Sequence, residues 1–374
     1  MLDERAITVT AFARAPGKVR IHRFFLSLLS LLLLLLVGTG AAYQAFVNHM
    51  PRINIKHAAL LPAPRFALSP GETVPTRDPL AGNAENFLLV GSDSSGTVAQ
   101  GRSDIIVLAH ISDGRKQVHL VNFPGDLYVD VPGYGKDTIS SAYRYGGSQL
   151  LARTVQQLVD VPIDHAGVIT FTGLQGMTDG LLGVDVTVDK ASAGPGLTTL
   201  SKGVNHLDGT AALGFIRERN QPGENDITRG RRQLTFLQSL MVKALAKDAL
   251  SNRYALAEFK VAATANLTVD NAFTAEQMRS LASALKGLGS KDIVSITAPV
   301  TGLGKSATGA QVDVVNVSRM ALLSIALRTD TMASWGSPRM ADTLIAGFMI
   351  PQAGCLHVGQ AQAHELHTGL PSRG

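Results

Sequence analysis

A long apolar run near the N-terminus limits most strongly what this 374-residue chain can fold into. Residues Phe24 to Val47 include no charged side chain, and a helix needs about 20 apolar residues to cross the hydrocarbon core of a bilayer. Basic residues outnumber acidic ones in residues 1–23, and basic flanks of a membrane span stay on the cytoplasmic side. The sequence therefore predicts a cytoplasmic basic tail at 1–23, one transmembrane anchor at 24–47 and an extracytoplasmic remainder.

The apolar run is also compatible with a cleaved signal peptide, because the small residues from Gly38 to Ala42 suit a cleavage site. Its apolar core is long for a signal peptide, which favours an uncleaved signal-anchor. The next segment, 48–85, contains six prolines from Pro51 to Pro79, a composition that resists helix and sheet. We expect this segment to be an extended extracytoplasmic linker.

Residues 86–330 alternate short β-branched runs with segments of helical periodicity, which predicts an α/β domain. The expected strands are 87–90, 105–111, 118–123, 166–171, 184–188 and 293–300. The expected helices include 147–159, 173–182, 208–215 and 228–247, and Asp208 and Thr274 suit N-cap positions. Residues 331–374 show no sustained periodicity and are predicted to be a flexible C-terminal tail.

The charge and cysteine content narrow the function classes. The net charge of +5 suits an acidic ligand, but the excess is small and partly lies in the N-terminal tail, so no nucleic-acid partner is expected. The chain has one cysteine, Cys355, which excludes an intramolecular disulfide and any metal site built from cysteines.

An arginine-rich segment from Arg217 to Gln233 is the clearest candidate for ligand binding. Five arginines occur in this segment, at the end of one expected helix and the start of the next. Arg229 and Gln233 are four residues apart and share one helical face, while the positive end of a helix attracts anions. The planar guanidinium suits paired phosphate oxygens. The alternative is a solvated basic helix start without a ligand.

Two aspartates are expected at neighbouring strand ends. Asp93 follows the first predicted strand, and Asp104 opens the second. Paired carboxylates beside a phosphate site describe a Mg²⁺ site, because Mg²⁺ takes one or two carboxylates and completes its shell with water and substrate oxygens. Taken singly, each aspartate is also typical of a turn.

Six ordered motifs between Asn86 and Asp330 resemble the LytR-CpsA-Psr family of cell-envelope proteins. They are NFLLVGSD, GRSDIIVLAHI, DLYVDVPGYGKDTISSAYRYGG, TFTGLQGMTDGLLGVDV, LDGTAALGFIRER and DITRGRRQ. The resemblance implies an α-β-α sandwich with a mixed central sheet, outside a bacterial plasma membrane, that encloses a polyprenyl tail. It also implies transfer of a glycopolymer from a polyprenyl-pyrophosphate carrier to a peptidoglycan acceptor, with formation of a phosphodiester.

The resemblance also assigns roles to residues of this sequence. The metal-associated aspartates, with Mg²⁺ as cofactor, fall on Asp93, Asp104 and Asp226. The pyrophosphate-binding residues fall on Arg217, Arg219, Arg229 and Gln233, and Arg102 is a further candidate. The expected catalytic set is Asp93, Asp104, Arg217, Arg219 and Asp226. A carboxylate takes the proton of the attacking sugar hydroxyl, and the sequence leaves open which one.

One position departs from the family pattern. The family usually has Pro-Arg-Asp after the third strand, whereas this chain has Pro124-Gly125-Asp126. Loss of one preorganised donor typically lowers a rate about a hundred- to a thousandfold. An alternative is therefore a weakened homologue that binds lipid-linked precursors without efficient turnover, unless Arg102, Arg115 or Arg144 substitutes. A regulator of envelope genes is a third class, disfavoured by the lack of a helix-turn-helix pattern.

Overall fold

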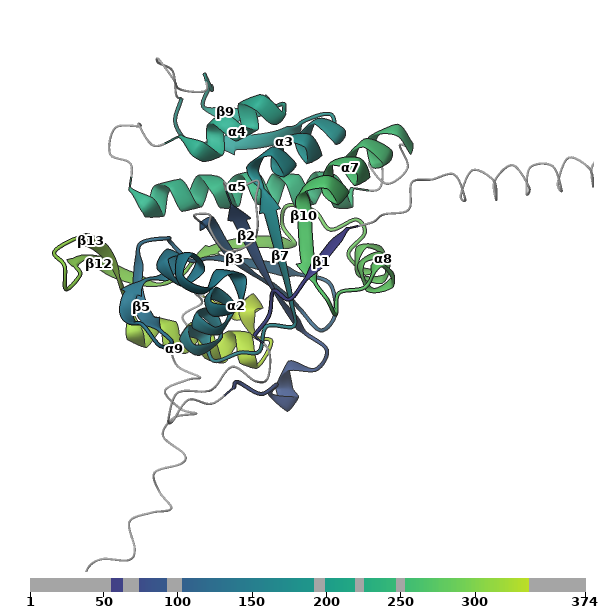
Figure 1. Cartoon of the computed structure of the whole chain (residues 1–374). Helices are drawn as coiled ribbons and strands as arrows, with labels where there is room; N and C mark the ends of the chain where they lie inside the picture. The colour runs from purple at the N-terminus through teal and green to yellow at the C-terminus, as the bar shows by residue number, and fades with distance from the viewer. Residues whose placement is uncertain are drawn as a thin grey trace, which may run out of the picture. The chain divides into compact units, whose positions relative to one another are not determined.

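The computed structural model describes residues 55–62, 74–92, 103–191, 199–218, 225–246 and 253–335, without the side chains of residues 104 and 253–256 (Figure 1). The predicted tail 1–23 and anchor 24–47 lie outside these residues. Within the described ranges, no helix has both the length and the apolar character that a membrane crossing requires.

A seven-stranded mixed sheet forms the centre of the domain, in the order β1-β10-β7-β2-β3-β4-β11. The strands are β1 (Lys56–Ala58), β2 (Glu85–Ser92), β3 (Ser103–Ile111), β4 (Val118–Asn122), β7 (His165–Thr170), β10 (Leu267–Asp270) and β11 (Ile293–Thr297). The pairs β2–β7, β4–β11 and β1–β10 are parallel, and the remaining pairs are antiparallel. The prediction of a mixed α/β fold is confirmed.

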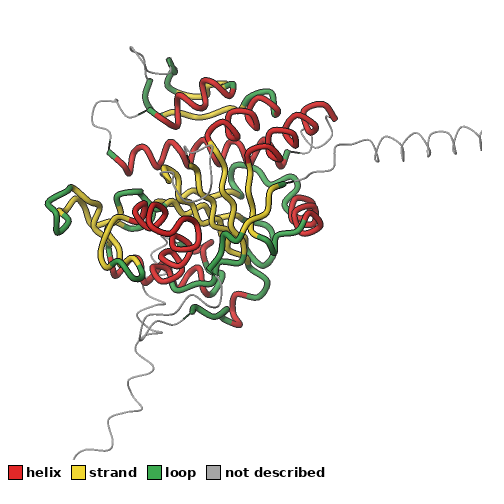
Figure 2. Tube along the Cα trace, in the orientation of Figure 1, coloured by secondary structure: helices red, strands yellow, loops and turns green. Residues whose placement is uncertain are grey.

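Helices cover both faces of this sheet (Figures 1 and 2). In β3, Ile105 and Val107 join one buried cluster while Ile106 and Leu108 join the other, because successive side chains of a strand point to opposite faces. The helices on the first face are α3 (Phe171–Gly180), α4 (Gly209–Arg217), α5 (Asp226–Leu245) and α7 (Arg253–Asn266). The helices on the second are α2 (Ile139–Val159) and α9 (Val317–Arg328). A short helix, α8 (Ala275–Ala284), follows β10.

Two smaller sheets accompany the central one, and of their strands the sequence predicted the one at 184–188. One has the order β12-β13-β5-β6, with β5 (Leu127–Val131), β6 (Gly135–Thr138), β12 (Val300–Lys305) and β13 (Gln311–Val315). The other is the hairpin β8 (Val184–Val188) and β9 (Gly203–Leu207). The strand expected at 293–300 is confirmed as β11, but it ends at Thr297, and β12 starts at Val300 in a different sheet. Pro299 lies between them and lacks the N–H that a continuous ladder needs.

The expected linker 48–85 is partly folded into the domain. Lys56 to Ala58 form β1 on β10, and Leu60 is fully buried in the core. A 3-10 turn, η1 (Pro79–Ala81), is capped by the Asp78 side chain. A three-residue strand carries too little pattern to be recognised in the sequence, since its pairing partner lies about 210 residues later in the chain.

The folded domain extends beyond residue 330, where the flexible tail 331–374 was expected to begin. The 3-10 turn η2 (Met332–Ser334) buries Met332, and Trp335 packs against the same core. Residues 336–374 lie outside the described ranges.

The predicted helix signals hold in several places. Asp208 caps α4 by accepting from Ala211 N, and Thr274 forms a capping box with Gln277 at the start of α8. Helix α2 begins eight residues before the predicted start at 147, and the backbone leaves the helical conformation at Gly146 and Gly147. Gly147 has a φ of 62°, which glycine adopts readily. This interruption divides α2, and the predicted helix 147–159 is its second half.

Candidate functional site

The candidate site lies at one edge of the central sheet, which we call the C-terminal edge. It is defined by the last residues of three strands that run in the same direction, Ser92, Asn122 and Thr170, and by Ser103, which pairs with Ser92. Ligands of open α/β sheets bind beyond the carboxyl ends of strands, where loops and helix termini converge. The last residue of α4 and the first residue of α5 lie at this edge.

The strand register explains how Asp104 reaches this edge. Gly91 pairs with Ile105 and Ser92 pairs with Ser103, so Asp104 is the extra residue of a β-bulge. The backbone of Asp104 therefore lies beside the end of β2, as the sequence predicted. Asp93 and Arg102 lie outside the described residues, and so does the side chain of Asp104, so their roles remain predictions.

Helix α5 brings Asp226 and Arg229 to the edge. Asn225 and Thr228 form a capping box that fixes the start of the helix. Arg229 Nη2 donates to Asp226 Oδ1, and Asp226 Oδ2 accepts a hydrogen bond of 3.2 Å from the backbone N of Asp126. The side chains of Asp226 and Arg229 are 8% and 18% exposed, so this pair is held in a partly desolvated position.

The loop after β4 places Gly125 next to this pair. A Cβ atom at Gly125 would lie 3.7 Å from Asp226 Oδ2 and 3.7 Å from Ser140 Cβ, which is ordinary van der Waals contact. Gly125 is not among the described glycines with positive φ. The position therefore has room for a side chain directed at Asp226, and its backbone does not require glycine.

Arg217 reaches the same edge from α4. It is the last residue of that helix, it is exposed, and its Cζ lies 4.6 Å from the ring centroid of Phe171. Phe171 follows β7 directly, so the cation–π contact fixes the guanidinium at the end of the central sheet. Among the described carboxylates, none forms an ion pair with Arg217. Because the side chain is exposed, its donors are accessible to a ligand.

Other members of the arginine-rich segment hold helices together. Gln233 is 3% exposed, and its Nε2 donates to the Ile216 carbonyl at 3.4 Å. Arg232 donates to the backbone and carboxylate of Glu218, at 3.3 Å for the carboxylate contact. Gln233 is therefore turned into the contact between α4 and α5 in this structure, and Arg232 has a structural role. Arg219 lies outside the described residues.

Asp313 is a site residue that the sequence did not reveal. It is 2% exposed, its N–H donates to the Asp126 carbonyl at 2.9 Å, and its Oδ2 has no hydrogen-bond partner in the structure. Burial raises the pKa of Asp313 to about 6, and the nearby carboxylates of Asp226 and Asp126 add to the effect. In the sequence, Asp313 is a single polar residue among the valines of the segment Gln311 to Val315, a pattern typical of a strand with one exposed face. The sequence therefore does not indicate that Asp313 is buried or belongs to the site.

The carboxylates of Asp226 and Asp313 lie where the Mg²⁺ site was predicted. Among the side chains that the structure describes, no three His, Cys, Asp or Glu are arranged to hold a metal ion. Asp226 is the one predicted metal ligand with a described side chain, and it already pairs with Arg229. The buried Asp313 oxygen without a donor and the nearby Asp226 provide hard oxygen atoms, so the chemistry of this edge suits a hard cation.

The structure describes two of the three arginines that were considered as substitutes for the missing one. Arg115 pairs with Glu85 at 3.1 Å at the opposite end of β2 and β3, so it cannot replace an arginine at Gly125. Arg144 lies on the first part of α2, one turn from Ser140, whose N–H donates to the Gly125 carbonyl at 3.1 Å. Arg102 lies outside the described residues.

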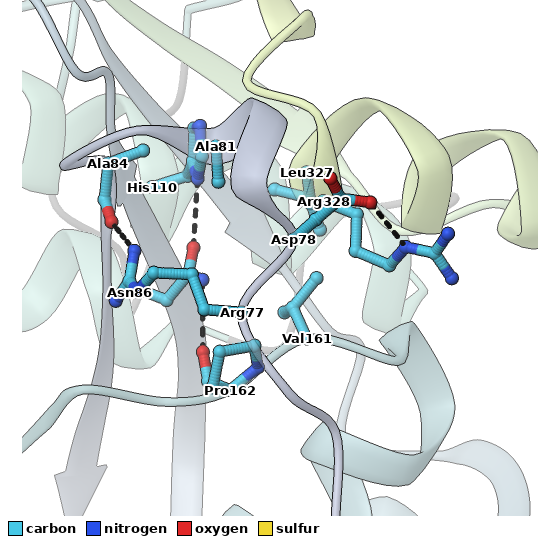
Figure 3. Close-up of a pocket in the computed structure, with 10 residues that line it drawn as sticks. All are labelled: Arg77, Asp78, Ala81, Ala84, Asn86, His110, Val161, Pro162, Leu327 and Arg328. Carbon is cyan, nitrogen blue, oxygen red and sulfur yellow. Dashed lines mark hydrogen bonds and ion pairs between the residues drawn. The ribbon is translucent and has the colours of Figure 1, made fainter.

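Two cavities lie away from the C-terminal edge. A cavity of about 10 Å³ lies beside Asn86 and His110, at the opposite end of the sheet. Figure 3 shows the residues that line it. His110 contacts Asn86 Oδ1 at 2.8 Å and Asp330 at 3.0 Å, and the space holds at most one water molecule. A cavity of about 460 Å³ opens between α2, α9 and the β5–β13 sheet, and no predicted site residue lines it.

Comparison with known proteins gives a consistent result. A model of the LytR_cpsA_psr family matches residues 66–328, more than half of the chain. The polyisoprenyl-teichoic acid–peptidoglycan teichoic acid transferase TagT of Bacillus subtilis is 32% identical over 223 residues, which cover 57% of this chain and 67% of TagT. The corresponding transferase TagU of Enterococcus faecalis is 33% identical over 205 residues, 54% of this chain and 66% of TagU. The match spans about two thirds of these relatives.

The chain is also similar to a solved structure and to a relative with a different name. TagT with bound octaprenyl pyrophosphate lipid matches with a TM-score of 0.52 and 25% identity, over 71% of this chain and 99% of that chain. The regulatory protein MsrR of Staphylococcus aureus is 30% identical over 217 residues, 58% of this chain and 64% of MsrR.

Proposed function

The chain belongs to the LytR-CpsA-Psr family, and on that premise we propose that it transfers a glycopolymer from a polyprenyl-pyrophosphate carrier to peptidoglycan. The observation that carries the proposal is the pair of guanidinium groups at the C-terminal edge. Arg217 on α4 and Arg229 on α5 come from different helices and both lie at this edge, Arg217 beyond β7 and Arg229 beside the loop that follows β4. A structure of the relative TagT holds octaprenyl pyrophosphate, an anion that such an edge suits.

The chemistry is a phosphoryl transfer. An acceptor hydroxyl attacks the phosphorus that carries the glycopolymer, the bond to the bridging oxygen breaks, and polyprenyl phosphate leaves. Arg217 and Arg229 neutralise the charge that accumulates on the phosphates, and the family pattern assigns the same role to Arg219. A carboxylate of the site accepts the proton of the hydroxyl. The product is a phosphodiester between glycopolymer and peptidoglycan.

Magnesium is part of the proposal. Asp93, Asp104 and Asp226 would hold Mg²⁺, which supplies positive charge to the phosphate oxygens when bound. Asp226 would then exchange part of its contact with Arg229 for the cation, which frees guanidinium donors for phosphate. We also propose that the domain at 86–330 works outside a bacterial plasma membrane, anchored by the segment 24–47.

A transfer assay tests the proposal. Purified full-length chain, a polyprenyl-pyrophosphate glycan, peptidoglycan and Mg²⁺ are combined, and release of polyprenyl phosphate is measured together with phosphodiester-linked product. We expect release that depends on both acceptor and Mg²⁺, and loss of at least about a hundredfold in rate for Arg217→Ala. Arg231→Ala is the matched control, since Arg231 is exposed on the same segment. No release at enzyme concentrations that reveal slow turnover would refute the proposal.

A second candidate function rests on Gly125. Without the family arginine, the chain would hold the lipid-linked precursor and turn it over slowly or pass it to an active relative. Tight binding of the precursor with no measurable transfer selects this function. The name of the relative MsrR keeps a regulatory role as a third candidate, and a change in envelope gene expression that persists in the Arg217→Ala variant would favour it.

A further inference from the structure

Two exposed tyrosines stack on each other beside the first part of α2. The ring centroids of Tyr134 and Tyr145 are 4.6 Å apart, and the ring planes differ by 12°. Tyr134 is 57% exposed and Tyr145 is 39% exposed. The Arg144 guanidinium lies 5.1 Å from the Tyr145 ring centroid. A stacked pair of exposed aromatic rings presents an apolar flat surface with polar groups at its margin.

Local backbone geometry holds both rings in place. Tyr134 ends a tight turn in which its N–H donates to the Val131 carbonyl at 2.9 Å, with Pro132 and Gly133 between them. Gly133 has a φ of 78°, and proline followed by such a glycine is typical of a type II turn. Tyr145 directly precedes the interruption of α2 at Gly146. A ligand that binds here therefore meets rings that are already ordered.

A chain of polar groups connects the stacked rings to the candidate site. Ser140, which contacts Gly125, lies 3.3 Å from Thr138 through their hydroxyl oxygens, and Thr138 lies 2.8 Å from the Ser141 hydroxyl. Arg144 Nη2 donates to Ser141 Oγ at 3.0 Å and to the Tyr145 hydroxyl at 3.3 Å. The stacked rings are thus continuous with the loop next to Asp226, through side chains that offer donors and acceptors.

We propose that Tyr134 and Tyr145 form the subsite that binds a pyranose ring of the acceptor glycan strand. This inference rests on the proposed function and names the surface that receives its acceptor. The proposed contact is a sugar ring laid against an aromatic face, with its hydroxyls bonded to neighbouring polar groups.

The chemistry of the surface matches a sugar. The C–H groups on one side of a pyranose are weak donors to the negative face of an aromatic ring. The sugar hydroxyls need hydrogen-bond donors, which Arg144 supplies, and acceptors, which Asp137 supplies. The Tyr145 hydroxyl donates to Asp137 Oδ2 at 2.6 Å. Burial opposes ionisation of Asp137, yet this hydrogen bond and others hold its pKa below the ordinary value.

Position favours the acceptor strand over the donor glycan. The sugar attached to the carrier begins directly at the phosphate, beside Arg217 and Arg229. The stacked rings are separated from that point by several residues of α2, and Tyr134 is more than half exposed, as suits a polymer that arrives from solvent. Binding of the donor glycan at the stacked rings is the alternative that the test below distinguishes.

Two ligands separate this inference from the proposed function. Full-length chain is titrated with peptide-free peptidoglycan glycan strands, and separately with geranyl pyrophosphate, a carrier analogue without sugar. The variants are Tyr134→Ala, Tyr134→Phe and, as an exposed apolar control on β12, Leu303→Ala. We expect Tyr134→Ala to weaken glycan-strand binding about tenfold, while Tyr134→Phe and Leu303→Ala stay within about twofold of the unchanged chain.

The readouts distinguish failure of one idea from failure of the other. Geranyl pyrophosphate binding should survive Tyr134→Ala and be lost in Arg217→Ala; no binding by the unchanged chain would count against the proposed function alone. Unaltered glycan-strand affinity in Tyr134→Ala, with the fold intact by circular dichroism, overturns the subsite. Loss of affinity for the carrier-linked glycan in place of the strand overturns the assignment to the acceptor. Saturation-transfer NMR should show the strongest transfer to protons on one face of the sugar.

Discussion

Restoring an arginine at position 125 is the sharpest perturbation of the site. Gly125 has a backbone conformation that other residues adopt, and a Cβ there meets Asp226 Oδ2 and Ser140 Cβ only at 3.7 Å. The Gly125→Arg variant should therefore fold, and the smaller freedom of its unfolded chain contributes up to about 1 kcal/mol of stability. The new guanidinium would extend towards Asp226 and the edge where Arg217 lies.

The expected gain in rate follows from two opposing effects. One preorganised donor at the transition state is worth about a hundred- to a thousandfold. A guanidinium about 4 Å from a carboxylate gains roughly 4 kcal/mol at an effective dielectric of 20, so Asp226 and Asp313 compete with the phosphate for it. We therefore expect a rise of about ten- to a hundredfold in transfer rate, and a fall in the pKa of Asp313 from about 6.

Gly125→Gln is the matched control, because it adds a long side chain with donors but no charge. Rates are measured as release of polyprenyl phosphate with saturating acceptor, and the Asp313 pKa by NMR of its carboxyl carbon. An unchanged rate in Gly125→Arg, with polyprenyl pyrophosphate bound and the fold intact, would refute the role given to the missing arginine. An equal rise in Gly125→Gln would show that charge is not the cause.

Three further predictions concern stability. Arg232→Ala should lower the free energy of unfolding by about 3 kcal/mol because it removes the guanidinium that pairs with the buried carboxylate of Glu218, whereas Arg231→Ala, on the exposed side of the same turn, should change it by less than about 0.5 kcal/mol in urea denaturation. Gly230→Ala should cost about 1–3 kcal/mol although alanine favours helices, since its Cβ would lie 2.3 Å from a buried amide nitrogen on β4. Asp313→Asn and His119→Leu should change the pH dependence of unfolding in opposite directions between pH 4 and pH 6.

The sign of that pH dependence follows from proton uptake. Burial, with a smaller effect of His110, lowers the pKa of His119 from 6.5 to about 4, so the unfolded state binds more protons in that window and acid removes about 3 kcal/mol of stability. The pKa of Asp313 is raised from 3.8 to about 6, so the folded state binds more protons there and a rise in pH removes a similar amount. The two effects oppose each other between pH 4 and pH 6. Asp313→Asn should therefore leave stability that rises with pH, and His119→Leu stability that falls.

Equal slopes in the two variants and the unchanged chain would contradict these pKa directions. For the other two predictions, a neutral Arg232→Ala would mean that the contact between α4 and α5 contributes little, and a stabilised Gly230→Ala would mean that the close approach to β4 relaxes at no cost.

Local patterns in the sequence predicted much of the fold. The caps at Asp208 and Thr274 and the apolar periodicity of α3 and α5 depend on residues within one or two turns, and these elements lie where they were expected. The β-branched runs of β2, β3 and β4 were recognised for the same reason. Elements whose stability comes from distant partners were missed, such as β1 on β10 and β13 beside β5.

The candidate site shows the same division. The sequence identified Asp226 and Arg229 because they belong to one helix start, and it placed Asp104 beside the end of β2. It gave no indication that Gln233 faces the buried contact with α4, since solvent exposure on a helix depends on which neighbour covers each face. Asp313 joins the site only through pairing of β13 with β5, nearly 200 residues apart in the chain.

The central claim is that the C-terminal edge of the sheet binds a polyprenyl pyrophosphate through arginines of α4 and α5. A crystal structure of the full-length chain with a polyprenyl pyrophosphate tests it most directly. We predict phosphate oxygens within hydrogen-bond distance of Arg217 and Arg229, and a lipid tail that runs between the sheet and its helices. A pyrophosphate bound elsewhere, such as in the cavity between α2 and α9, would contradict the claim.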